Sequence, residues 1–123
     1  MNKNTILKHL GPGEQYAGVI LGKDGQPDHH LVLMPGEVSG VDWQGALTWA
    51  QNLGGDLPTR REQALLYANL PEEFQLDWYW SSTQYAPYPY AAWFQLFDYG
   101  YQYHTRKGAE GRARAVRRIV IEE

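Results

Sequence analysis

The chain has 123 residues, with 14 Asp and Glu against 11 Lys and Arg, and it contains no cysteine. Its net charge of -3 gives no overall field that selects a nucleic acid or a membrane surface as partner. The absence of thiols excludes a disulfide framework and a thiolate zinc site. With 43% hydrophobic and 20% charged residues, the composition is typical of one globular domain, residues 1–123.

The first residues are polar, and no apolar run approaches the length of a signal peptide or a membrane span. We therefore expect a soluble protein, cytoplasmic in its producing cell, without membrane contact. Gly11, Pro12 and Gly13 interrupt regular structure, so residues 1–14 are expected to form an arm or a loose first strand.

Residues 15–37 are predicted to form an N-terminal β-hairpin. Two β-rich runs, 16–21 and 30–34, flank a loop that contains the turn signal Asp24-Gly25. Pro35 and Gly36 then end the second strand.

Two helices are predicted next. Asp42 precedes a segment, 43–53, in which apolar residues recur at helical spacing, and Gly54 follows as a stop signal. In the second helix Thr59 stands three residues before Glu62, which is the spacing of a capping box, and Pro71 closes the element.

From residue 79 the pattern changes to β. The runs 79–82, 92–97, 101–106 and 113–121 predict four short antiparallel strands, with a turn at Asp98 to Gly100 between the second and third. The loop 84–90 holds two prolines among three tyrosines, so we expect an ordered excursion.

Aromatic residues are concentrated between Trp78 and Tyr103. Trp80, Trp93, Phe94 and Phe97 lie in predicted strands and are expected in the core. Rigid tyrosines on loops give a large contact area at low entropic cost. The tyrosines of this stretch therefore predict a ligand-binding surface. The alternative is that these rings only cover the sheet. The candidate ligand-binding residues are Tyr85, Tyr88, Tyr90, Tyr99, Tyr101, Tyr103, His104 and Arg106.

The region from Arg106 to Arg118 is locally basic. Arg106, Arg112 and Arg114 beside stacking aromatics would suit a single-stranded nucleic acid. The other interpretation is that these cations protect a sheet edge and pair with carboxylates, and the negative overall charge favours it.

Catalytic and metal sites are not indicated. His29 and His30 are adjacent, so on a strand they point to opposite faces and cannot hold one ion together. Ser81, Ser82, Asp98 and His104 supply the residue types of a nucleophilic triad, but no nucleophile elbow surrounds either serine. The two serines are expected to cap strand ends or to bond the neighbouring backbone instead. We expect no enzyme activity, no cofactor and no metal.

Four short motifs carry a family resemblance over roughly residues 38–119. They are Leu57-Pro58-Thr59, Tyr79-Trp80-Ser81-Ser82-Thr83, Ala92-Trp93 and Arg114-Ala115-Val116-Arg117. In this order they resemble a family of phage and bacterial domains of unassigned function. That family is similar to the C-type lectin fold of formylglycine-generating enzymes and variable phage receptor-binding proteins. The resemblance implies an α+β fold in which two helices pack on a twisted antiparallel sheet, with a long loop region, over residues 38–123.

The chain also departs from these relatives. It lacks the cysteines of formylglycine-generating enzymes, and Gln26-Pro27-Asp28, which matches a calcium-lectin motif in letters, lies on the early hairpin. The resemblance therefore implies a non-enzymatic binding module of phage or prophage origin. Its partner would be a protein or a host-surface ligand, met in the host cytoplasm or on a virion. The alternative is a nucleic-acid accessory protein.

Overall fold

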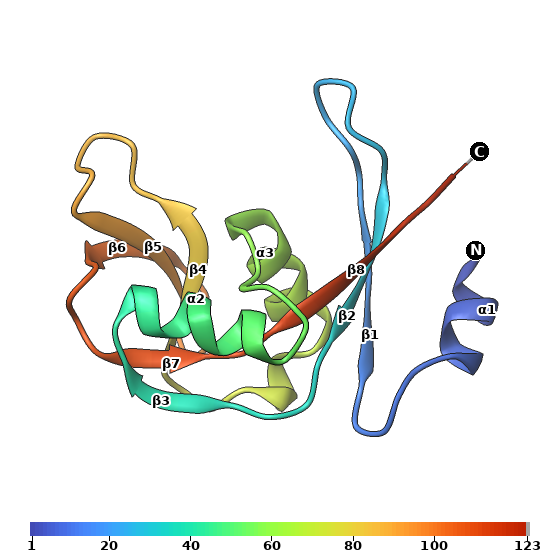
Figure 1. The fold of residues 1–123 in the computed structure, drawn as a ribbon, viewed down its shortest axis with the longest axis horizontal. Helices are drawn as coiled ribbons and strands as arrows, with labels where there is room; N and C mark the ends of the chain where they lie inside the picture. The colour runs from blue at the N-terminus through green and yellow to red at the C-terminus, as the bar shows by residue number, and fades with distance from the viewer. Residues whose placement is uncertain (123) are drawn as a thin grey trace.

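A computed structural model describes residues 1–122 and contains three α-helices, one 3-10 helix and eight strands (Figure 1). In chain order they are α1 (Lys3–Lys8), β1 (Gln15–Ile20), β2 (His29–Leu33), β3 (Val38–Val41), α2 (Trp43–Asn52), α3 (Arg60–Asn69), η1 (Pro71–Glu73), β4 (Trp78–Gln84), β5 (Ala91–Leu96), β6 (Gln102–Arg106), β7 (Gly111–Ala113) and β8 (Val116–Val120). The predicted α+β class is confirmed.

The strands form two sheets, one of three strands in the order β1-β2-β8 and one of five in the order β3-β7-β4-β5-β6. The predicted hairpin is confirmed by the antiparallel pairing of β1 with β2. Asp24 and Gly25 both have positive φ, and Gln26 N–H donates to the Lys23 carbonyl across their turn at 3.0 Å. The hairpin is not an appendage, because the chain returns to pair β8 with β2.

The prediction of four antiparallel strands after residue 79 is correct only for β4, β5 and β6. The last predicted run divides into β7, which pairs parallel to β4, and β8, which joins the other sheet. The break falls at Arg114, whose guanidinium donates to the carbonyls of Met34 and Glu73 at 2.9 and 2.6 Å. The prediction also missed β3, which pairs with β7.

The expectation of an arm or strand at residues 1–14 was wrong for Lys3–Lys8, which form α1. The Asn2 side chain caps this helix by accepting from Thr5 N–H at 2.9 Å. Ile6 is 1% exposed, and the Met1 carbonyl lies 2.8 Å from His30 Nε2. The Met1–His30 contact, together with the Lys3 ammonium 5.8 Å from the centroid of the Tyr16 ring, connects the start of the chain to the hairpin.

Both predicted helices are confirmed with their caps. Asp42 accepts from Gly45 N–H at 2.8 Å at the start of α2. The capping box of α3 is complete, because Glu62 N–H donates to the Thr59 hydroxyl and Thr59 N–H donates to the Glu62 carboxylate.

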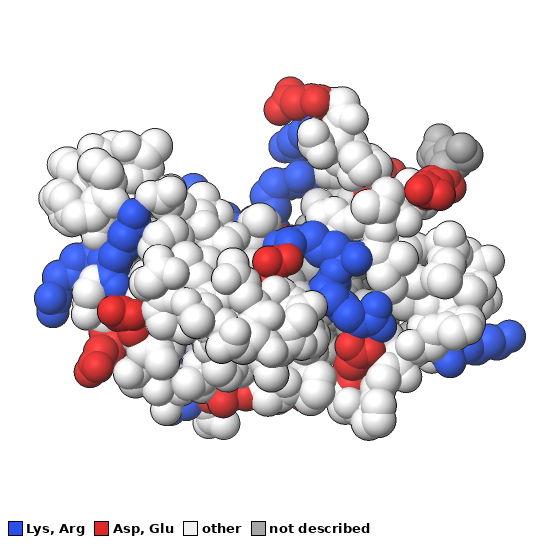
Figure 2. Space-filling model, viewed as in Figure 1, with Lys and Arg blue, Asp and Glu red and all other residues white. Residues whose placement is uncertain are grey.

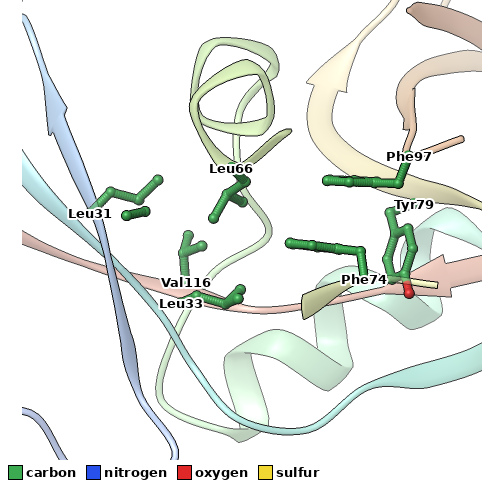
Figure 3. Packing of buried hydrophobic residues seen from close by; sticks show 8 residues of the cluster. Leu31, Leu33, Leu66, Phe74, Tyr79, Phe97 and Val116 are labelled. Atoms are coloured by element: carbon green, nitrogen blue, oxygen red, sulfur yellow. The ribbon is translucent and has the colours of Figure 1, made fainter. Parts of the chain in front are cut away.

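The two helices cover opposite faces of the five-stranded sheet. Successive residues of a strand point to opposite faces, so Tyr79 and Trp80 of β4 enter different cores. Trp80 packs with Ala46 and Ala50 of α2, whereas Tyr79 packs with Leu66 of α3. The α3 core is shared with the three-stranded sheet through a further set of residues that includes Leu31, Leu33 and Val116 (Figure 3).

The expected core aromatics divide into two groups. Trp80 is 0% exposed and Phe97 is 3% exposed, as predicted. Trp93 and Phe94 are only partly buried, although Ala91 and Ala92 before them in β5 are buried. Phe97 stacks on Phe74 at 3.9 Å between ring centroids, which closes the α3 core at the end of β5.

Candidate functional site

The loop between β4 and β5 is an ordered, uncharged projection. Tyr88 N–H donates to the Tyr85 carbonyl at 3.1 Å, and Ala91 N–H donates to the Tyr88 carbonyl at 2.9 Å. Tyr85 N–H in turn donates to the Ala91 carbonyl at 2.9 Å, so the ends of the loop are tied together. Residues 85–91 contain no charged side chain, and Figure 2 shows an uncharged projection at the place of this loop. The prediction of an ordered excursion is confirmed.

Five of the predicted ligand-binding residues form a continuous set of packed rings, most of them stacked, called here the aromatic stack: Tyr85, Tyr88, Tyr90, Tyr103 and His104. Tyr85 lies parallel to His104 with 3.6 Å between ring centroids, and His104 stacks on Tyr103 at 4.5 Å. Tyr88 stacks on Tyr90 at 5.5 Å. Two segments distant in sequence, the β4–β5 loop and β6, therefore present one aromatic surface.

The outer rings of the stack are open to solvent. Tyr90 is 63% exposed, Tyr103 is 56% exposed and Tyr88 is 48% exposed. Tyr85 and His104 are partly buried beneath them. The arrangement is rigid at its base and accessible at its rim, which is the geometry of a preorganised contact surface.

Trp93 and Arg60 support the stack from the α3 side. The Trp93 ring meets Tyr85 and His104 edge-on, at 5.2 and 5.5 Å. The Arg60 guanidinium lies 3.4 Å from the Trp93 ring centroid, and its Nε donates to Gln102 Oε1 at 2.9 Å. Sequence reasoning placed Trp93 in the core and missed Arg60, because no local pattern links the first residue of α3 to β5.

Three predicted site residues lie outside the stack. Tyr99 is 79% exposed in the β5–β6 turn, and Tyr101 is 56% exposed just before β6. Among residues 1–122, neither ring packs against a ring of the stack. Arg106 ends β6 and lines a cavity of about 520 Å³ beside the start of α2, together with Asp42 and Glu110.

Arg112 and Arg114, which the nucleic-acid alternative would use, are both engaged in the fold. Arg112 bridges Asp77 and Glu37, with 2.8 Å for each ion pair, as the carboxylate-pairing alternative predicted. Glu37 also accepts from the Tyr79 hydroxyl. Burial and this carboxylate raise the pKa of Tyr79 well above its usual value. Arg114 is 8% exposed and donates to two backbone carbonyls.

The residue types of a catalytic triad serve other roles. The Ser81 hydroxyl is buried, donates to the Trp93 carbonyl at 2.7 Å and accepts from Thr83 N–H, as the backbone-bonding alternative predicted. His104 is stacked between Tyr85 and Tyr103.

The adjacent histidines bond separate partners. His29 Nε2 lies 2.7 Å from the Glu62 carboxylate, and His30 lies 2.8 Å from both the Tyr16 hydroxyl and the Met1 carbonyl. In the Gln26-Pro27-Asp28 motif, Asp28 accepts from Gly22 N–H within the hairpin loop. Over residues 1–122, no group of three His, Asp or Glu side chains could hold a metal ion. No helix in the same range is long and apolar enough to cross a membrane.

Neither protein-family models nor the curated proteins compared with this sequence give a match.

Proposed function

We propose that this protein is a non-enzymatic binding module that recognises a protein or host-surface ligand through the aromatic stack. The observation that carries the proposal is the combination of four tyrosines and His104 in one set of packed rings, in which three of the tyrosine rings are open to solvent. Tyrosine and tryptophan rings supply much of the contact energy in protein interfaces, and an ordered surface loses little entropy on binding.

The family resemblance extends this proposal. It implies a C-type-lectin-like fold in which a long loop region carries the binding face. The tyrosine loop between β4 and β5 would be part of that region. It also implies a phage or prophage origin, with the protein acting in the host cytoplasm or on a virion.

A second candidate function, binding of single-stranded nucleic acid, is favoured by the stacked rings together with nearby cations. Nucleic-acid bases stack on aromatic side chains irrespective of sequence. Arg106 is exposed at the end of β6, and Lys107 follows it with its ammonium 2.6 Å from the Gln84 amide oxygen. This version would use Arg106 and Lys107, since Arg112 and Arg114 are held by the fold.

Affinity capture from a host lysate, with and without nuclease, tests both candidates. We expect the wild type to capture a defined protein that survives nuclease treatment and is lost for the double variant Tyr88→Ala, Tyr90→Ala. Tyr99→Ala is the matched control, because it removes an exposed tyrosine outside the stack. Both variants should stay within about 1 kcal/mol of wild-type stability, as surface substitutions usually do.

The outcomes separate the two candidates. Capture that disappears with nuclease, and whose affinity falls steeply with salt, would support the nucleic-acid function because counterion release drives such binding. Capture that is equally strong with the double variant would rule out the aromatic stack as the contact surface.

A further inference from the structure

A second surface lies in the groove between the hairpin and the start of α3. Two cavities, of about 590 and 380 Å³, open there and share four lining residues: Ile20, His29, Arg61 and Arg118. The larger one extends to Arg60, Thr83 and Gln102, and the smaller one extends along the hairpin loop to Lys23 and Pro27. Because they share a wall, the cavities form one elongated groove.

The groove is positive although the whole chain is negative. Its lining holds Arg60, Arg61, Arg118 and Lys23 against one carboxylate, Glu62. Arg118 is neutralised by Glu62 and Asp56. Among residues 1–122, no carboxylate pairs with Arg60, Arg61 or Lys23. Figure 2 shows Lys and Arg side chains along the region of β8 and up toward the hairpin loop.

Two of these arginines are held in place but keep unused donors. Arg61 donates through Nη2 to the Leu21 carbonyl at 2.8 Å, and Arg60 donates through Nε to Gln102. Within residues 1–122 their remaining side-chain N–H groups have no hydrogen-bond partner. Each guanidinium carries five donors in a fixed plane, so a carboxylate can be bound at either without displacing an existing contact.

Aliphatic residues also line the groove, beside uncharged polar residues such as Thr83 and Gln102. Ile20, Leu21, Pro27, Ala64 and Val120 contribute to its walls, and Leu21 and Val120 are 64% and 49% exposed. The lining contains no Tyr, Trp or Phe. A single-stranded nucleic acid, whose bases commonly stack on aromatic side chains, would find none in this lining. An elongated groove with cations and apolar side chains matches an extended peptide that alternates acidic and apolar residues.

We propose that this groove binds an acidic, extended peptide segment of a partner protein. Carboxylates of the segment pair with Arg60 and Arg61, and its apolar side chains cover Leu21 and Val120. The site is separate from the aromatic stack and does not depend on the function proposed for the stack. The two surfaces meet where Arg60 lies on Trp93.

The contact between Arg60 and Trp93 provides the readout. We would titrate the ¹⁵N-labelled protein with a ten-residue peptide in which Glu alternates with Val, and follow the indole N–H signals by NMR. The Trp93 signal should shift, whereas that of Trp49 on α2 should not. A peptide with Gln in place of Glu tests the need for charge, and inorganic phosphate tests for unspecific anion binding.

Variants then assign the site. Arg61→Gln should weaken acidic-peptide binding about tenfold or more, because a charge-assisted hydrogen bond is lost. Lys8→Gln makes the same charge change on α1, away from the groove, and should leave the affinity unchanged. Tyr88→Ala should also bind the peptide normally, which separates this site from the aromatic stack. A thermal melt of each variant confirms that it is folded.

Three results would overturn the proposal. They are an unshifted Trp93 signal with the acidic peptide, equal binding of the Gln peptide or of phosphate, and an Arg61→Gln variant that is folded and binds as the wild type does.

Discussion

Arg118 of β8 and Glu62 of α3 form a two-point ion pair, with Nε to Oε2 at 2.7 Å and Nη2 to Oε1 at 2.8 Å. Glu62 is 1% exposed, and the same carboxylate also accepts from the backbone of Thr59 and contacts His29. One buried carboxylate therefore caps α3 and joins it to the three-stranded sheet. This contact between Glu62 and Arg118 also forms one wall of the basic groove.

Glu62 makes folding stability depend on pH. Burial raises the pKa of its carboxyl, but the hydrogen bonds from Arg118 and Thr59 together outweigh burial and hold the pKa below its usual value. A carboxyl with a lowered pKa in the folded state stabilises the fold above its unfolded pKa, which is about 4.3. That stabilisation is lost as the pH falls through the lower, folded-state value.

We therefore expect Glu62→Gln to reduce the free energy of unfolding at pH 7 by about 3 kcal/mol, because it breaks a buried ion pair. The difference from the wild type should narrow as the pH falls below the unfolded pKa of about 4.3 and through the lower pKa of the folded Glu62 carboxyl, which then becomes protonated. Urea denaturation at pH 7 and pH 3 measures this. Glu72→Gln, at an exposed position, should stay within about 0.5 kcal/mol of the wild type at pH 7. If the difference in the free energy of unfolding between Glu62→Gln and the wild type stays constant with pH, the lowered pKa of Glu62 is contradicted.

Trp80 and Trp93 should respond differently to truncation, although both were predicted in the core. Trp80 is fully buried and donates from its indole to the Val41 carbonyl at 3.0 Å, so Trp80→Ala should cost about 3 to 5 kcal/mol. Trp93 is partly exposed, and Trp93→Ala should cost about 1 to 2 kcal/mol while loosening Tyr85 and His104. Denaturant midpoints compare the two variants. Equal shifts of the denaturant midpoint would show that Trp93 contributes as much to stability as Trp80 does, despite its partial exposure.

The elements that could be predicted from the sequence are those with local causes. The capping box joins Thr59 to Glu62, and the hairpin turn needs only Asp24 and Gly25 with positive φ. Both signals lie within four residues, so no tertiary information is required. The same holds for the ordered tyrosine loop, which is closed by hydrogen bonds among residues 85 to 91.

Features that depend on distant partners could not be predicted. The division between β7 and β8 is fixed by Arg114, which bonds a carbonyl on Met34, 80 positions away in the sequence. The support of the aromatic stack depends on Arg60, which bonds Gln102 across 42 positions. Tyrosine composition could indicate a contact surface, but the strand pairing decides that Tyr103 joins the stack. Tyr99 remains outside it.

Gly100, in the turn that leads from β5 into β6, is expected to be intolerant of a side chain. Its φ is +83°, and a Cβ built there would lie 2.7 Å from the Tyr67 ring. Gly36 is a matched control, because its φ is +95° and its Cβ would meet nothing within 4 Å. Alanine at a positive φ costs roughly 1 to 2 kcal/mol, and overpacking adds typically about 1 to 3 kcal/mol.

We expect both Gly36→Ala and Gly100→Ala to lower the free energy of unfolding. The loss for Gly100→Ala should exceed the loss for Gly36→Ala by about 1 to 3 kcal/mol. A double-mutant cycle isolates the clash, since Tyr67→Leu removes the ring that the new methyl group meets. In that background the cost of Gly100→Ala should fall to the cost of Gly36→Ala. Urea midpoints at constant m-value give the four free energies. If Gly100→Ala costs the same with Tyr67 and with Leu at this position, backbone strain alone explains the effect, and Tyr67 does not fix the turn that precedes Tyr101.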